Sequence, residues 1–292
     1  MIRVMSQPEK SAVKPPAPRL DFKKAAQEIL RDHPDAAGHF LIIDPETHER
    51  HGSLGARLRG RTNDLFRSQL KKAFKHAKET TAPIADLIRL GSVSAVVVTA
   101  GRETPAEALF DLHRQAGRLL VSRGADNIRF FMALFGVAYA ADTAAGDAYA
   151  AIRYLRQPDA DPEFLRRLSL TRATDFLRTG EPEHLSSPVI DKIIADRDFS
   201  KMKIEDLVET AGIYVKGFTP SRADSEALVK EFAPLKGVAM DEAGLKRLAD
   251  ITQASTNPLA VTLGKKVLAA AGMTLATAPV EAKAAPSPTP KP

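Results

Sequence analysis

Residues 104–123 read TPAEALFDLHRQAGRLLVSR, and this stretch predicts one amphipathic helix around which the chain is organised. Pro105 suits the first helical position, and Gly124 suits the stop that follows the last turn. Arg114 and Arg118 are four residues apart, so they share one face of this helix. Five apolar residues recur at steps of three and four and form its buried stripe: Leu109, Leu112, Ala116, Leu119 and Leu120.

The segments on either side of this helix predict the fold class. Apolar and β-branched runs at residues 39–44 and 92–100 predict strands before it. Amphipathic segments separated by Gly and Pro predict helices after it. We therefore expect an α+β protein that is mostly α-helical, with a few strands before the helix and a helical C-terminal region. The predicted divisions are a disordered arm, an α+β core, a helical region and a Pro/Ala tail, at residues 1–20, 21–200, 201–277 and 278–292.

Two of these helices carry a resemblance to gluzincin-type zinc metallopeptidases, over residues 90–160 at most. The residues RQAGR resemble a rewritten HExxH motif, with Arg114 and Arg118 at the histidine positions and Gln115 at the glutamate position. The stretch DTAAGDAYAAIRYL begins 24 residues after Arg118 and resembles the second helix of that family. Thr143 then stands at the position of the glutamate ligand, and Asp147 at that of the supporting aspartate. The resemblance implies a zincin-like core.

The family's activity is zinc-dependent peptide hydrolysis, and the substitutions argue against it here. Zinc ligation at this motif needs two neutral imidazoles, and a carboxylate must take the proton from the bound water. Guanidinium groups stay protonated and cannot ligate a metal, and an amide is no base. We therefore expect no metal and no other cofactor. The sequence favours a catalytically inactive, metallopeptidase-like pseudoenzyme that binds or scaffolds an unknown protein or peptide.

The surviving aspartate gives this hypothesis a structural consequence. If the two helices face each other, Asp147 pairs with Arg114 or Arg118 and replaces the metal site by an ion pair. Asp142 is placed near the start of its helix, in solvent.

Composition leaves other functions open. The net charge is +6, with 42 basic and 36 acidic residues interleaved along the chain. The alternative hypothesis is a basic helical protein associated with nucleic acid, through four lysines on one side of a helix predicted near residues 63–79: Lys71, Lys72, Lys75 and Lys78. A third is an enzyme with a metal-free site of another kind. Glu181, Glu183 and His184 share a turn, which we interpret as a solvated loop.

The sequence also bears on location. There is no cysteine, which excludes disulfides and thiolate chemistry and is compatible with a reducing compartment. No apolar stretch reaches the length of a membrane span or has the form of a signal peptide. We expect a soluble, cytoplasmic, bacterial-type protein without a membrane partner.

Overall fold

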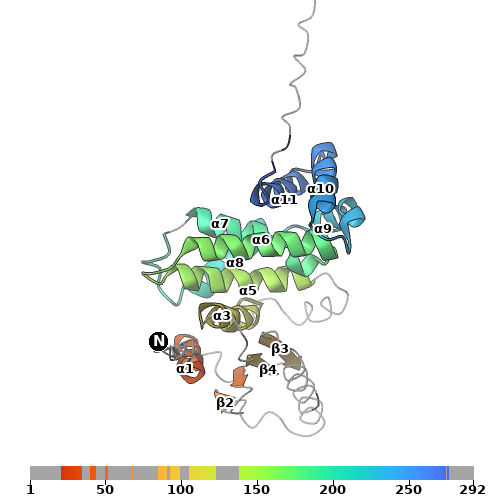
Figure 1. The fold of residues 1–292 in the computed structure, drawn as a ribbon. Coiled ribbons are helices and arrows are strands. Elements are labelled where there is room, and N and C mark those ends of the chain that lie inside the picture. The colour runs from red at the N-terminus through yellow and green to blue at the C-terminus, as the bar shows by residue number, and fades with distance from the viewer. Residues whose placement is uncertain are drawn as a thin grey trace, which may run out of the picture.

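Figure 1 shows the computed structural model of the chain. The predicted arm at residues 1–20, the predicted tail at 278–292 and the four lysines Lys71, Lys72, Lys75 and Lys78 lie outside the described residues. The described residues are 21–34, 40–43, 50–51, 68, 85–90, 93–98, 105–122, 138–196, 198–273 and 275.

Helices dominate the described chain. Two short 3₁₀ helices, η3 and η4, span Pro182–His184 and Ala233–Leu235. The α-helices are α1 Phe22–Asp32, α3 Pro105–Ser122, α5 Ala138–Leu155, α6 Pro162–Thr179, α7 Ser187–Asp196, α8 Leu207–Phe218, α9 Arg222–Glu231, α10 Glu242–Ala254 and α11 Pro258–Ala270.

Four short strands are defined by their backbone: β1 Phe40–Ile43, β2 Arg50–His51, β3 Ala85–Leu90 and β4 Val93–Val98. They pair in the order β2-β1-β4-β3. β1 runs parallel to β4, and β3 and β4 pair antiparallel as neighbours in sequence. α3 lies against β3 and β4.

The packed body of the protein is nevertheless helical, and the predicted α+β class is wrong. Among the residues whose side chains the structure describes, 77% are helical and none lies in a strand or sheet. Both hydrophobic clusters of this part draw their members from helices and from the turns between helices. The prediction gave too much weight to short β-branched runs. The apolar stripes of the helices pack against one another instead.

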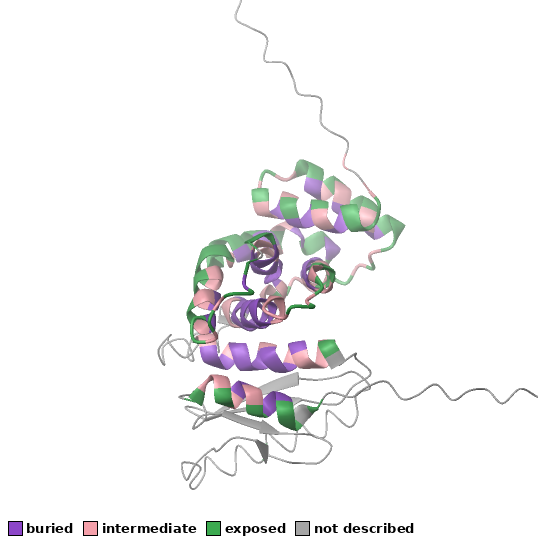
Figure 2. Ribbon diagram, turned by 90° about the vertical axis from the view of Figure 1, so that its left-hand side faces the viewer, coloured by how far each residue is buried: buried purple, intermediate pink, exposed green. Residues whose placement is uncertain are grey.

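α5 is the central helix of this body and lies between α3 and the layer of α6, α7 and α8 (Figure 1), and the buried residues gather around the middle of the molecule (Figure 2). It contacts α3, α7, α8 and η3, and every residue from Thr143 to Ile152 is buried. A helix that is buried on all sides needs small apolar residues around its whole circumference, which explains the alanine-rich sequence of α5. Tyr149, Leu112 and Ile152 belong to the hydrophobic cluster around it.

A second hydrophobic cluster joins the C-terminal half of α6 to α9, α10 and α11. Phe176 of α6 and Phe232 meet edge to face, with ring centroids 6.3 Å apart. Leu248 and Leu263 are buried in the same cluster. Each such side chain contributes about 1.5–3 kcal/mol when it is removed from water. No helix among the described residues is both long and apolar enough to cross a bilayer.

Candidate functional site at the crossing of α3 and α5

Two glycines bring α3 and α5 into close contact. A Cβ atom on Gly117 would lie 2.5 Å from Cβ of Tyr149, and one on Gly146 would lie 2.6 Å from the carbonyl oxygen of Arg114. Both distances are too short for real atoms, so larger residues would push the helices apart. The glycines thus fix a spacing at which Arg114 and Arg118 of α3 reach side chains on α5.

Asp147 is the centre of the site, and its side chain is completely buried. Nε of Arg114 lies 3.0 Å from Oδ1, so the expected pairing of Arg114 with Asp147 across the two helices is present. Arg172 of α6 donates from Nε to Oδ2 at 3.0 Å and from Nη2 to Oδ1 at 3.4 Å. Ser186 donates to Oδ2 at 2.5 Å. Groups from α3, α6 and the start of α7 therefore converge on one carboxylate.

The electrostatics keep this carboxylate ionised. Burial alone would raise the pKa of Asp147, but Arg172, Arg114 and the hydrogen bond from Ser186 outweigh burial, so its pKa is lowered. Burial raises the pKa of Asp111, whose Oδ1 lies 3.6 Å from Nη1 of Arg114. Among the described residues, Nε of Arg114 has no partner with hydrogen-bond alignment. Arg172 therefore holds Asp147 by directed bonds, and Arg114 holds it by charge.

Arg118 takes a different partner. Its Nε donates to Oδ2 of Asp142 at 2.7 Å, and its Nη1 donates to Oε1 of Gln115 at 3.0 Å. The placement of Asp142 in solvent is therefore wrong, since its side chain is only 11% exposed. The helix begins at Ala138, about one turn before Asp142, and this turn carries Asp142 into the contact with α3. Thr143, next to it, is buried.

The structure thus brings together the positions that the resemblance singled out, at the crossing of α3 and α5: Arg114, Gln115, Arg118, Thr143 and Asp147. It adds Arg172 and Ser186, which lie 25 and 39 residues from Asp147 in the sequence. No spacing rule connects such distant residues, so the sequence carried no signal for either.

The chemistry of this set is that of a structural ion-pair cluster. Guanidinium, amide and hydroxyl groups occupy the positions that the resemblance compares with metal ligands and a base, and none of these groups can take either role. The carboxylates of Asp142 and Asp147 are each paired with arginine. The cluster holds three helices together and offers no activated nucleophile or general base.

No family model, curated protein or solved structure matches the chain. These comparisons give no indication of a zinc metallopeptidase. The resemblance rests on the residues of α3 and α5 alone.

A second polar cluster, partly buried, lies between α6, α7 and α11. Nζ of Lys266 lies 2.6 Å from Oδ1 of Asp191 and 2.9 Å from Oγ of Ser187, and it also contacts Oγ of Ser169. Burial lowers the pKa of Lys266, but Asp191 opposes this shift. A lysine must be neutral to activate a serine, and the ion pair favours its charged form. Ser169 and Ser187 are also buried, so the cluster ties α11 to α6 and α7.

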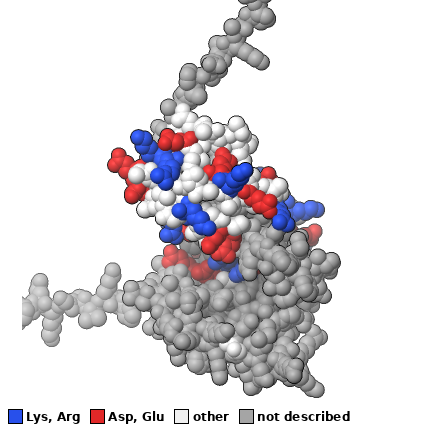
Figure 3. Space-filling view, turned by 90° about the vertical axis from the view of Figure 1, so that its right-hand side faces the viewer, with Lys and Arg blue, Asp and Glu red and all other residues white. Residues whose placement is uncertain are grey.

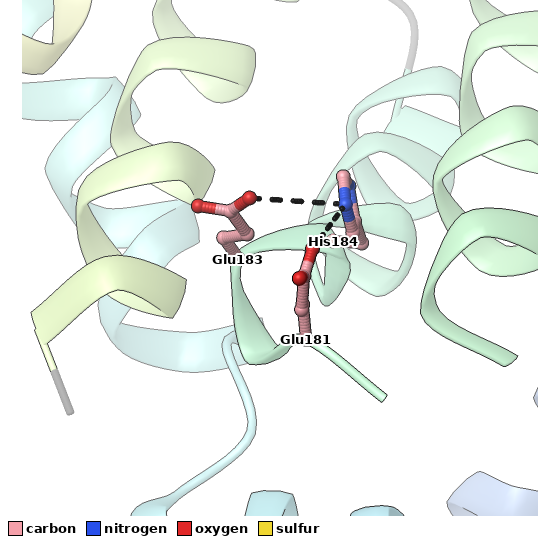
Figure 4. Close-up of side chains that lie close together, drawn as sticks. All are labelled: Glu181, Glu183 and His184. Atoms are coloured by element: carbon pink, nitrogen blue, oxygen red, sulfur yellow. Dashed lines mark ion pairs between the residues drawn. The ribbon is translucent and has the colours of Figure 1, made fainter. Parts of the chain in front are cut away.

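Figure 4 shows the acidic turn at η3, where the side chains of Glu181, Glu183 and His184 converge. Nε2 of His184 lies 3.4 Å from Oε2 of Glu181 and 3.8 Å from Oε1 of Glu183. Among the described residues, these three form the one set of at least three donor groups close enough to share a metal ion. All three come from one short turn, and the Glu181 side chain is 59% exposed. Nothing outside the turn fixes them as ligands.

Proposed function

We propose that the chain is a catalytically inactive, metallopeptidase-like protein with a binding or scaffolding role towards a protein or peptide. The observation that carries the proposal is the buried carboxylate of Asp147, which two arginines and a serine engage. An ion pair at this position takes over the bridging role that a metal ion has in the family. The crossing of α3 and α5 then serves as a rigid frame. The proposed location is the cytoplasm, with which the absence of cysteine is compatible.

The surface gives less support to a nucleic-acid partner. Figure 3 shows Lys and Arg interleaved with Asp and Glu over the described part of one face. Polyanion binding draws on a patch of one sign, and the described part of this face has none.

The proposed ancestry is tested by restoring the motif. A restored variant carries the four substitutions Arg114→His, Gln115→Glu, Arg118→His and Thr143→Glu. Two histidines four apart on any helix bind some zinc, so the matched control places the same pair on exposed α9, as Arg222→His with Glu226→His. We expect the restored variant to bind one Zn²⁺ per chain at least about tenfold more tightly than the control. The reason is that two further carboxylates lie at its site, the one introduced by Thr143→Glu and that of Asp147.

Calorimetric titration with Zn²⁺ gives both affinities, and circular dichroism checks that each variant is folded. Equal affinities would mean that α3 and α5 hold no remnant of a metal site. The inactivity is tested separately on the unaltered protein, incubated with Zn²⁺ and a denatured polypeptide. Cleavage that a chelator abolishes would disprove it.

A further inference from the structure

A chain of hydrogen bonds joins the end of α1 to α5. Nη2 of Arg153 donates to Oδ2 of Asp32 at 2.7 Å, and Nη1 of Arg153 donates to the hydroxyl of Tyr149 at 3.3 Å. The same hydroxyl lies 2.7 Å from Nε2 of His33, the C-cap residue of α1. The two rings are in contact as well, with centroids 5.6 Å apart.

Arg153 fixes the direction of this chain. A guanidinium group only donates hydrogen bonds, so the Tyr149 oxygen accepts from Arg153 and its own proton points to another acceptor. Nε2 of His33 lies 2.7 Å away, and we assign it as that acceptor, with the ring proton of His33 placed on Nδ1. Burial raises the pKa of Tyr149 to about 12, so the hydroxyl keeps its proton. A proton on Nε2 of His33 would therefore remove the acceptor for Tyr149.

The charges around His33 act in the same direction. Burial lowers the pKa of His33, Arg153 lowers it further, and Asp32 partly opposes them. His113 of α3 also interacts with His33 and Arg153, and its Nε2 is buried without a hydrogen-bond partner among the described residues. α1 also lies against β2, which contributes two further titratable residues by sequence, Arg50 and His51.

Among the described residues, the apolar contact of α1 with the rest of the protein is small. Its buried residues are Ala25, Ala26 and Ile29, and the partly buried Leu30 packs against the same cluster, so two large apolar side chains are involved. A helix of 11 residues does not persist in water by itself. Loss of the polar contacts at its C-terminal end therefore has a large effect on its docking.

We propose that His33 is a proton-sensitive catch that holds α1 on α3 and α5 at neutral pH and releases it in acid. Protonation leaves the Tyr149 proton without its acceptor and places a cation beside Arg153, which already donates to the same hydroxyl. The detached state binds the proton more readily than the docked state, so acid favours detachment. For one proton, the ratio of detached to docked α1 rises by at most about tenfold per pH unit. Detachment uncovers the part of the α3–α5 pair that α1 shields.

Hydrogen–deuterium exchange of the full chain at pH 7.5 and 5.5, corrected for intrinsic exchange rates, tests this. Peptides from α1 report docking, and peptides from α11 report global opening. We expect exchange of α1 to rise several-fold more at pH 5.5 than that of α11, which rises only with the loss of global stability. Unchanged exchange of α1, or a parallel rise in both helices, would overturn the proposal.

Two variants assign the effect to His33. In His33→Gln the side-chain amide oxygen can accept from Tyr149 but does not titrate, so we expect α1 to stay docked at both pH values. An acid response equal to that of the unaltered protein would overturn the assignment. The second variant, Tyr149→Phe, removes the hydrogen-bond donor to His33. It tests the assignment independently if α1 is not docked in His33→Gln. We expect faster exchange of α1 already at pH 7.5 and a smaller further rise at pH 5.5. A rise as large as that of the unaltered protein would count against the catch.

Discussion

The substitution Asp147→Asn removes one charge from the buried cluster and changes little in shape. Arg172, 12% exposed, is then left without its paired counter-charge, and Arg114, 19% exposed, keeps only Asp111 at 3.6 Å. Breaking a buried ion pair from one side costs about 3–5 kcal/mol, because the remaining charge is stranded away from water. We expect the free energy of unfolding to fall by this amount. The control is Glu226→Gln, since the pair of Arg222 and Glu226 is about two-thirds exposed and contributes less than about 1 kcal/mol.

Urea denaturation followed by circular dichroism measures both changes, provided that the slope of the transition is the same in all variants. A double-mutant cycle then divides the effect between the partners of Asp147. Arg172→Met should show the larger coupling with Asp147→Asn, because Arg172 makes directed hydrogen bonds. Arg114→Met should show a smaller coupling, since this contact lacks hydrogen-bond alignment. A cost below about 1 kcal/mol for Asp147→Asn, or coupling below about 0.5 kcal/mol with both arginines, would refute the ion-pair cluster.

Three further predictions concern packing, pH and capping. Gly117→Ala should destabilise the protein by about 1–3 kcal/mol, because its Cβ would collide with Tyr149. Gly217→Ala, at an exposed position of α8, meets nothing within 4 Å and should be neutral or stabilising by up to about 1 kcal/mol. Thermal unfolding of the two variants compares them, and equal shifts would contradict the close helix contact. His113 is neutral when folded, since burial lowers its pKa well below 6.5, so unfolding takes up a proton below that pH. Protonation of His113 should therefore lower the free energy of unfolding by up to about 1.4 kcal/mol per pH unit. Between pH 6.5 and 5, the urea midpoint of His113→Leu should depend less steeply on pH than that of the unaltered protein. The same dependence in the variant and in the unaltered protein would exclude His113 as a cause. Ser221→Ala removes the capping box of α9 and should lower the free energy of unfolding by about 0.5–2 kcal/mol. No measurable loss of stability would mean that α9 does not need its cap.

Local signals predicted the helices well. The stretch chosen as the organising helix, residues 104–123, agrees with α3 to within one residue at each end. Ser221 and Asp241 are the N-caps of α9 and α10, and their side chains accept hydrogen bonds from backbone N–H groups within the next turn. Periodicity and capping involve residues close in sequence, so one sequence suffices to read them. The contact of Arg114 with Asp147 followed from the resemblance, which supplied the pairing of two helices.

Contacts between residues far apart in the sequence could not be predicted in this way. Lys266 meets Ser169 and Ser187 across 97 and 79 residues, and nothing in their composition marks them as partners. Asp142 was misplaced for a related reason. α5 is so rich in alanine that its apolar residues form no single stripe, so neither its start nor its buried face could be inferred from periodicity.

The charge balance at the crossing of α3 and α5 refines the hypothesis of a lost metal site. Two arginines in place of two histidines supply the positive charge of one zinc ion, and the simplest expectation is that both turn to Asp147. Only Arg114 does so, while Arg118 is paired with Asp142. The second positive charge on Asp147 comes from Arg172 on α6. The two oxygens of the buried Asp147 carboxylate need hydrogen-bond donors as well as positive charge. The guanidinium of Arg172 and the hydroxyl of Ser186 supply these donors, and a second arginine from the crowded face of α3 would supply mainly charge. If a metal site was lost here, its replacement therefore also required a residue from a third helix.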